Sequence, residues 1–148
     1  MQDLICLERG TTAHLPLMGP GEIEKVLRLE AAALALPQVA IPTDHVFQAG
    51  MYARTIMLPA GALLTGALIK IPTILIISGD VLIYGENGPE RFSGYHVALG
   101  RAGRKQAFYA LRDTYLTMLF PTEATTVDQA ERQFTDEYEK LFSRKERG

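Results

Sequence analysis

Residues 59–80 read Pro59-Ala-Gly-Ala-Leu-Leu-Thr-Gly-Ala-Leu-Ile-Lys-Ile-Pro-Thr-Ile-Leu-Ile-Ile-Ser-Gly-Asp80, an apolar run interrupted by glycine and proline. The isoleucine-rich pieces between these interruptions favour buried β-strands, because β-branched side chains pack well on a pleated surface. A membrane-spanning helix needs about 20 consecutive apolar residues, which the glycines, the prolines and Lys70 prevent. The run therefore predicts buried strands bent at glycines, and we expect no membrane association.

The segments around this run alternate between apolar and polar residues. Met51–Leu58 places Tyr52, Arg54, Ile56 and Leu58 on one face of a strand. Strands are also expected at Ile69 and Ile71 and then over 74–77, over 81–84, after Gly88, and over 95–99, 106–111 and 114–120. The Asn-Gly pair in Gly85-Glu-Asn-Gly88 is a strong hairpin signal. Many short strands separated by glycine turns predict a sandwich or a barrel.

Helical spacing occurs on both sides of the strands. Apolar residues over 22–36 recur at helical intervals until Pro37. Thr126 and Gln129 form a capping-box pattern before an apolar stripe at Val127, Ala130, Phe134, Tyr138 and Leu141. We expect an N-terminal arm and helix (1–44), a β-barrel (45–122) and a C-terminal helix and tail (123–148) within one structural domain. The helices either close the barrel ends or pack against another subunit.

Composition limits the class of protein. The chain has 148 residues, 47% of them hydrophobic and 22% charged, with a net charge of −2. These values fit one soluble domain and provide no field that would recruit nucleic acid, so no specific nucleic-acid partner is expected. The single Cys6 excludes an internal disulfide and favours a reducing compartment. The acidic N-terminus predicts that the protein is not secreted through a signal peptide.

Several short motifs carry a family resemblance. They are Gly50-Met-Tyr-Ala-Arg54, Pro59-Ala-Gly61, Gly66, Ser78-Gly-Asp80, Glu86-Asn-Gly-Pro89, Gly103-Arg-Lys105 and Asp113-Thr114. In this order, from His45 to Thr122, the chain resembles small single-domain cupins, several of which are encoded in bacteriophage or prophage genomes. The resemblance implies a mainly β fold: a single cupin-type double-stranded β-helix, or jelly-roll barrel, with flanking α-helices.

The resemblance also locates where metal ligands would lie. Counted from Gly61, the two histidine positions of the first cupin motif fall on Ala67 and Ile69, and the third ligand falls on Thr73. Counted from Gly103, the last ligand falls on Gln106. Alanine and isoleucine have no donor atom, and threonine and glutamine are poor ligands for first-row metals. We therefore expect degenerate metal-ligand positions, no metal and no cofactor.

Other candidate residues carry less chemistry. Arg101, Arg104, Lys105 and Arg112 form a basic cluster that could contact an anion or a partner subunit, although a solvated loop is the favoured interpretation. Ser78-Gly-Asp80 is interpreted as a turn rather than a nucleophile. The dispersed His14, His45 and His96 are interpreted as structural, and the acids Glu86, Glu90 and Asp113 as turn residues. No catalytic residue is expected.

Alternation leaves the barrel interior open to two interpretations. If Ile69, Ile71, Leu116, Met118 and Phe120 point inward, side chains fill the usual cavity, which favours a scaffold over an enzyme. If the opposite faces point inward, a small apolar pocket survives, with Thr73 and Gln106 as its few polar groups.

The favoured functional hypothesis is a non-catalytic, metal-free cupin that acts as a structural or assembly component. Following the resemblance, we expect a phage head-decoration or tail protein that self-associates as a dimer or trimer and docks on other virion proteins. It would occur in the host cytoplasm during assembly and in the virion. The alternative is a small-molecule-binding or metal-independent enzyme domain that uses the barrel mouth. A third hypothesis is an auxiliary protein that blocks a host factor through its basic loop.

Overall fold

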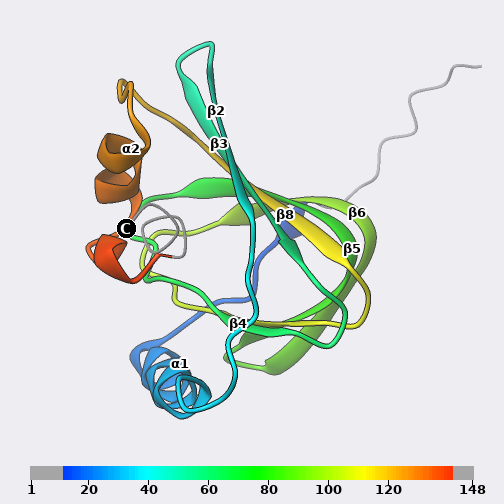
Figure 1. The fold of residues 1–148 in the computed structure, drawn as a ribbon. Coiled ribbons are helices and arrows are strands. Elements are labelled where there is room, and N and C mark those ends of the chain that lie inside the picture. The colour runs from blue at the N-terminus through cyan, green and yellow to red at the C-terminus, as the bar shows by residue number, and fades with distance from the viewer. Residues whose placement is uncertain (1–11, 142–148) are drawn as a thin grey trace, which may run out of the picture.

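The computed structural model describes residues 12–141, which fold into a β-barrel flanked by helices (Figure 1). The strands are β1 (Ala13–His14), β2 (Thr43–Gln48), β3 (Met51–Leu58), β4 (Leu63–Thr65), β5 (Thr73–Gly85), β6 (Gly88–Gly100), β7 (Ala107–Ala110) and β8 (Thr114–Pro121). The helices are α1 (Pro20–Ala33), α2 (Val127–Phe134) and the 3-10 helix η1 (Tyr138–Lys140). The predicted mainly β jelly-roll barrel, preceded and followed in the sequence by α-helices, is confirmed.

The long hairpin of β5 and β6 belongs to both layers of the barrel. Its first part continues into one layer in the order β1-β6-β5-β8-β3-β2, and its second part pairs through β7 with β4. The hairpin closes at the predicted turn, where Gly85 pairs with Gly88. The two strands therefore connect the layers that enclose the barrel interior.

The hairpin passes between the layers at a pair of facing glycines. Gly79 lies opposite Gly94, and both have positive φ angles, of 151° and 91° respectively. A Cβ atom added to Gly79 would lie 2.5 Å from Oγ1 of Thr114 on β8. The segment Ser78-Gly79-Asp80 is therefore part of strand β5, and the predicted turn at this position is wrong. The glycine serves a close approach of strands rather than a chain reversal.

The core follows the predicted alternation. Tyr52 and Leu58 of β3 are fully buried, and the other large buried side chains include Ile77, Val81, Ile83, Phe120 and Phe134. The described part of the N-terminal arm packs on this barrel, because β1 pairs in parallel with β6 and the Leu15 amide donates to the Leu99 carbonyl. Residues 1–11 of the predicted arm and the predicted tail after Leu141 lie outside the described residues.

The helices differ from their predicted extents. α1 ends at Ala33 instead of residue 36, since the amides of Ala35 and Leu36 form tighter turns with Ala32 and Ala33. The predicted cap of α2 is confirmed, because the Thr126 hydroxyl accepts from the Gln129 amide. The predicted helical stripe is wrong beyond Phe134: Thr135 is extended, and its hydroxyl accepts from the Glu137 amide.

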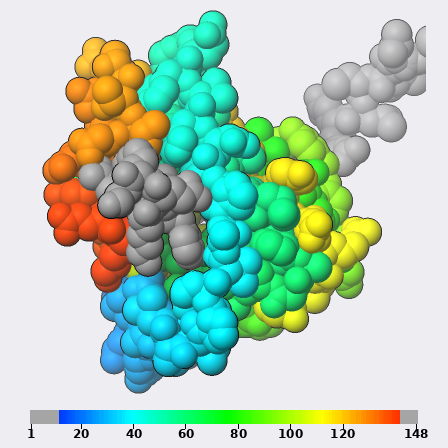
Figure 2. Space-filling model, viewed as in Figure 1, coloured from blue at the N-terminus to red at the C-terminus, as the bar shows by residue number. Residues whose placement is uncertain are grey.

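The helices lie on the same side of the barrel. In Figure 2, α1 and the segment 127–141 occupy one side of the molecule, and β5 and β8 the other. Each of these helical segments contributes residues to the wall of the barrel cavity. Within residues 12–141, no helix has the length and apolar character needed to cross a membrane. The apolar run around residues 59–80 instead forms β4 and the first part of β5.

Candidate functional site

The barrel interior encloses a cavity of about 180 Å³. Its walls are mainly apolar and come from both layers: Leu15, Ile41, Ile56, Leu64, Ile69, Leu75, Phe108, Leu116, Met118, Phe134 and Leu141. Ile69, Leu116 and Met118 point inward, as the first of the two interpretations of the alternation expected. They do not fill the barrel, however, and a cavity remains. A cavity of about 150 Å³ is large enough to hold a benzene molecule, so this one can enclose a small organic molecule.

The structure places three of the predicted metal-ligand positions on the cavity wall. These are Ala67, Ile69 and Gln106. Thr73 is buried, and its hydroxyl accepts a hydrogen bond of 2.5 Å from Arg104. The Gln106 side-chain amide donates to the carbonyl of Pro16 at 3.1 Å. The side chains at these positions therefore either lack donor atoms or already bind the protein.

A metal ion does not fit this arrangement. Across residues 12–141, no three histidine, cysteine, aspartate or glutamate side chains are grouped as a metal site would need. The Arg104 guanidinium instead bonds to the hydroxyl of Thr73 at the third ligand position. A fixed positive charge there opposes the binding of a metal cation.

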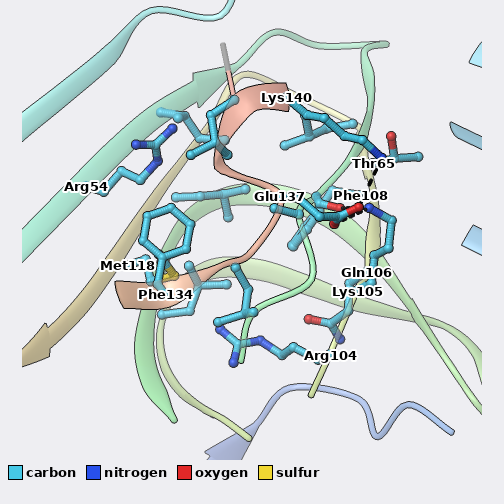
Figure 3. Close-up of a pocket in the computed structure, with 18 of the residues that line it drawn as sticks. Arg54, Thr65, Arg104, Lys105, Gln106, Phe108, Met118, Phe134, Glu137 and Lys140 are labelled. Carbon is cyan, nitrogen blue, oxygen red and sulfur yellow. Dashed lines mark hydrogen bonds and ion pairs between the residues drawn. The ribbon is translucent and has the colours of Figure 1, made fainter. Parts of the chain in front are cut away.

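Lys105 joins the barrel to the helices on one side of the cavity. Its side chain is 1% exposed, and Nζ donates to Glu30 of α1 at 3.0 Å, to Glu137 at 2.9 Å and to the Gly66 carbonyl at 3.0 Å. An ammonium group has three donors, so Lys105 is fully satisfied. Lys140, which is 62% exposed, also contacts both glutamates. Figure 3 shows Lys105, Glu137 and Lys140 close together on one wall.

Glu137 is held in its charged form. Burial alone would raise the pKa of this carboxyl, but hydrogen bonds from Lys105 and from the Leu68 amide outweigh it and lower the pKa. The amide bond measures 2.7 Å. A carboxylate bound by a buried ammonium and a backbone N–H is strongly stabilised over its neutral form. The chain between α2 and η1 is therefore fixed to the barrel by a charged contact.

A second ion pair lies on another wall. Arg54 of β3 donates to Glu131 of α2 at 2.9 Å, with side chains that are 10% and 0% exposed. The Arg54 guanidinium also lies over the Phe134 ring, 5.4 Å from its centre. Alternation grouped Arg54 with Tyr52 and Leu58 on one face of the strand, and the structure shows that this face points into the barrel. Glu131 is fully buried on α2, where its carboxylate pairs with Arg54.

Arg104 differs from the other cations of the cavity. The residue is 6% exposed, and its guanidinium donates to the Arg101 carbonyl at 2.8 Å and to the Thr73 hydroxyl. Among the described residues, no carboxylate lies within ion-pair distance of it. Burial lowers the pKa of Arg104 to about 10. The group stays protonated at neutral pH and is a buried cation held only by neutral acceptors.

The structure shows that the predicted basic cluster is wrong, because its four residues do not lie together on a solvated loop. Arg104 and Lys105 are buried and line the cavity, so they do not belong to a solvated loop. Arg101 is exposed in the loop before β7. Arg112 lies beyond the other end of β7, where its Nε is 3.8 Å from Asp80. The four residues therefore form no single surface patch, and only Arg104 and Lys105 belong to the site.

Four of the other candidates, namely His45, His96, Asp80 and Asp113, have structural partners. His45 Nδ1 lies 2.6 Å from the Tyr52 hydroxyl, and His96 Nε2 lies 2.8 Å from the Ser93 carbonyl. Asp80 is buried and accepts two hydrogen bonds from Arg91, and these bonds lower the pKa of its carboxyl. Asp113 accepts from the Ala60 amide. None of these residues lines the cavity.

Sequence reasoning did not identify the acidic residues that pair with the cations of the cavity. Glu30, Glu131 and Glu137 lie on or beside the flanking helices and reach the barrel only through its folded shape. Arg54 could have been found, since a charged residue on the inward face of a strand needs a partner. Helical periodicity offered a weaker signal for Glu131, which lies three residues before the buried Phe134.

Comparison with known proteins shows similarity to solved cupin structures. The sequence matches no protein-family model and no curated protein. A cupin superfamily protein from Desulfitobacterium hafniense is 13% identical, with 77% of this chain and 100% of that one covered and a TM-score of 0.48. The Cupin_2 domain of an XRE family transcriptional regulator from Enterobacter cloacae is 15% identical, with 56% and 99% covered and a TM-score of 0.46. An RmlC-like cupin family protein with a double-stranded β-helix fold from Methanocaldococcus jannaschii is 11% identical, with 59% and 85% covered and a TM-score of 0.47.

Proposed function

We propose that this cupin-type barrel binds a small organic molecule in its interior without a metal ion. The cavity of about 180 Å³ carries the proposal, because it survives inside a barrel whose inward residues are apolar. Preformed apolar pockets with a few placed polar groups are the usual form of small-molecule sites. The proposal corresponds to the alternative hypothesis drawn from the sequence.

The charged residues around the cavity support binding rather than simple packing. Burying charged groups beside an apolar space is costly unless each is paired. Here Lys105 and Arg54 fix three carboxylates from outside the barrel strands, and these pairs hold the helices over the cavity. The ion pairs therefore maintain a space that apolar side chains could otherwise have filled.

A ligand-binding experiment with matched variants tests this function. Ligand-observed NMR would measure the binding of benzene-sized probes, including benzyl alcohol, benzamide, benzoate and benzylamine, to the full chain. Ala67→Met adds side-chain volume inside the cavity wall, and Ala60→Met makes the same change at an exposed loop position. We expect saturable binding of at least one probe to the wild type and Ala60→Met, and its loss in Ala67→Met. No binding by any probe at millimolar concentration, or equal binding by Ala67→Met, would contradict the function.

Self-association is a second proposal, favoured by the outward face of the larger layer. The register of β6, β5, β8 and β3 aligns three rows of outward residues that contain no charged side chain. The rows are Leu99, Ile74, Leu119 and Ala53; Val97, Ile76, Thr117 and Thr55; and Tyr95, Ser78, Tyr115 and Met57. We call this surface the outer face. Tyr95 and Tyr115 are 64% and 55% exposed on it.

A second copy of this chain is the proposed occupant of the outer face. Four strands about 4.8 Å apart and three residues per strand cover roughly 400 Å² before side-chain relief is added. Two such faces approach the roughly 1,000 Å² that a specific interface needs. An uncharged surface is also compatible with itself under two-fold symmetry, since no like charges meet. The phage-particle role expected from the resemblance stays a prediction.

A further inference from the structure

The charges around the cavity do not balance. Four cationic side chains line it, namely Arg54, Arg104, Lys105 and Lys140. Three carboxylates neutralise them: Glu131 pairs with Arg54, while Glu30 and Glu137 each contact Lys105 and Lys140. Four cations against three carboxylates leave one positive charge in excess. Arg104 has no carboxylate partner among the described residues, so the excess charge is localised on it.

Arg104 also has hydrogen-bonding capacity that the protein does not use. A guanidinium group has five N–H donors, and the described residues accept from it at two contacts, the Arg101 carbonyl and the Thr73 hydroxyl. Buried donors without acceptors are rare and costly, and they call for a bound water or ion. The unused donors of Arg104 belong to a side chain that lines the cavity.

The position of Arg104 is fixed before any ligand arrives. The two hydrogen bonds hold its guanidinium, and Gly100 leaves room for it: a Cβ atom added to Gly100 would lie 2.5 Å from Cζ of Arg104. In Figure 3, Arg104 and Gln106 lie toward one end of the labelled residues and Lys140 lies toward the other. A cation immobilised in this way loses little conformational entropy when it binds an anion. The site is therefore preorganised.

We propose that the cavity takes a small monocarboxylate with an apolar body, and that Arg104 binds its carboxylate. This inference rests on the proposed small-molecule function. A carboxylate matches the planar fork of a guanidinium and would neutralise the excess charge. Apolar walls such as Ile56, Phe108 and Met118 suit the hydrocarbon part of the ligand and disfavour sugars or phosphorylated compounds. The volume limits that part to about the size of a benzene ring.

The other charged groups of the cavity are poor alternatives for this role. Lys105 already uses its three donors on Glu30, Glu137 and the Gly66 carbonyl. Arg54 pairs with Glu131, and a ligand carboxylate would have to compete with this buried ion pair. Lys140 is 62% exposed, and water weakens its attraction for an anion. Arg104 is the buried cation that a carboxylate can reach without breaking an ion pair among the described residues.

Isothermal titration calorimetry with benzoate and benzamide tests the inference. The two probes have the same size and shape and differ in charge. We expect the wild type to bind benzoate at least tenfold more tightly than benzamide, because a charge-assisted bond in a buried site is worth that much. Arg104→Gln should bring the two affinities within about twofold. Arg101→Gln removes an exposed arginine of the same loop and should keep the wild-type preference.

The results separate this inference from the proposed function. If benzamide binds the wild type as tightly as benzoate, the carboxylate inference is wrong while the cavity remains a binding site. If Arg104→Gln retains the preference for benzoate, another residue binds the carboxylate and the assignment of Arg104 is wrong. If neither these probes nor the wider NMR panel binds, the small-molecule function itself fails. Should Arg104→Gln not fold, the ratio of the benzoate and benzamide affinities of the wild type still decides whether the cavity prefers a carboxylate.

Discussion

At the scale of single residues, the barrel buries charged side chains around its cavity. Ala67 and Ile69 line the cavity without donor atoms, and Thr73 accepts from Arg104. Charged groups buried this deeply require partners, and the ion pairs of Lys105 and Arg54 supply them.

Removing the charge of Glu137 is expected to destabilise the fold. In Glu137→Gln, Lys105 keeps Glu30 and the Gly66 carbonyl but loses one of its two carboxylates. We predict a loss of about 1–3 kcal/mol in the free energy of unfolding, measured by urea denaturation at pH 7. Glu139→Gln, two residues away at an exposed position, should change stability by less than about 0.5 kcal/mol. Equal stability of Glu137→Gln and the wild type would contradict the role of this contact.

The lowered pKa of Glu137 predicts that its contribution to the free energy of unfolding depends on pH. The pKa of Glu137 is lower in the folded protein than its ordinary value of 4.5. A carboxyl with a lowered pKa stabilises the fold above its unfolded pKa, and that contribution is lost as the pH falls through the folded pKa. The stability difference between wild type and Glu137→Gln should therefore be full at pH 7 and shrink below about pH 4.5. A difference that is constant from pH 7 to pH 3 would show that the charge is not responsible.

The residues of the site were only partly predictable. Alternation correctly placed Arg54 on the same face as Tyr52 and Leu58, both of which are buried. Family spacing directed attention to Ala67, Ile69 and Gln106, which all line the cavity. The acidic partners could not be found in this way, because Glu30 lies 75 residues from Lys105 in the chain. Such contacts depend on how the helices pack against the barrel, which no local pattern records.

At the scale of elements, the sequence signals for a hairpin turn, a close approach of strands and a helix end differ in how reliably they can be interpreted. The hairpin at Gly85-Glu-Asn-Gly88 was predictable because Asn-Gly is a local turn signal, and in the structure Gly88 has a φ angle of 87° and pairs with Gly85. Gly79 was misinterpreted as part of a turn, since a glycine that admits a neighbouring strand looks the same in sequence as one that reverses the chain. The end of α2 at Phe134 was missed because the apolar spacing continues beyond it.

A substitution at Gly79 tests its role between the layers. In Gly79→Ala the new Cβ atom would lie 2.5 Å from Thr114 Oγ1 and 2.7 Å from Thr114 Cα, at a φ angle of +151°. We expect a loss of about 2–4 kcal/mol in the free energy of unfolding from overpacking and backbone strain. Gly21→Ala in α1 meets no atom within 4 Å and should be neutral or slightly stabilising. A neutral Gly79→Ala, measured by the same denaturation assay, would refute the close approach.

At the scale of the whole molecule, the barrel has two surfaces of different character. Its interior surrounds a cavity lined by apolar and charged side chains, and its outer face carries apolar and hydroxyl side chains without charge. The helices cover one side of the barrel, so they do not compete with a partner for the outer face (Figure 1). Binding inside the barrel and association outside it are therefore compatible in one molecule.

The proposed association predicts a change of oligomeric state on one substitution. Val97→Asp places a charge in the middle of the outer face, where Val97 is 46% exposed. We expect the wild type to sediment as a dimer in analytical ultracentrifugation and Val97→Asp to sediment as a monomer. Val39→Asp changes the same residue type at similar exposure, 49%, outside this face and should remain dimeric. A monomeric wild type at all concentrations tested, or a dimeric Val97→Asp, would contradict the proposed interface.

A crystal structure of the protein soaked with bromobenzene, and separately with 4-bromobenzoate, tests the central claim most directly. Anomalous scattering locates the bromine atom without reference to any assumed pose. The account predicts a bromine peak between the two layers, among Ile56, Phe108 and Met118. Bromine peaks confined to the surface, with the interior closed by side chains, would contradict it.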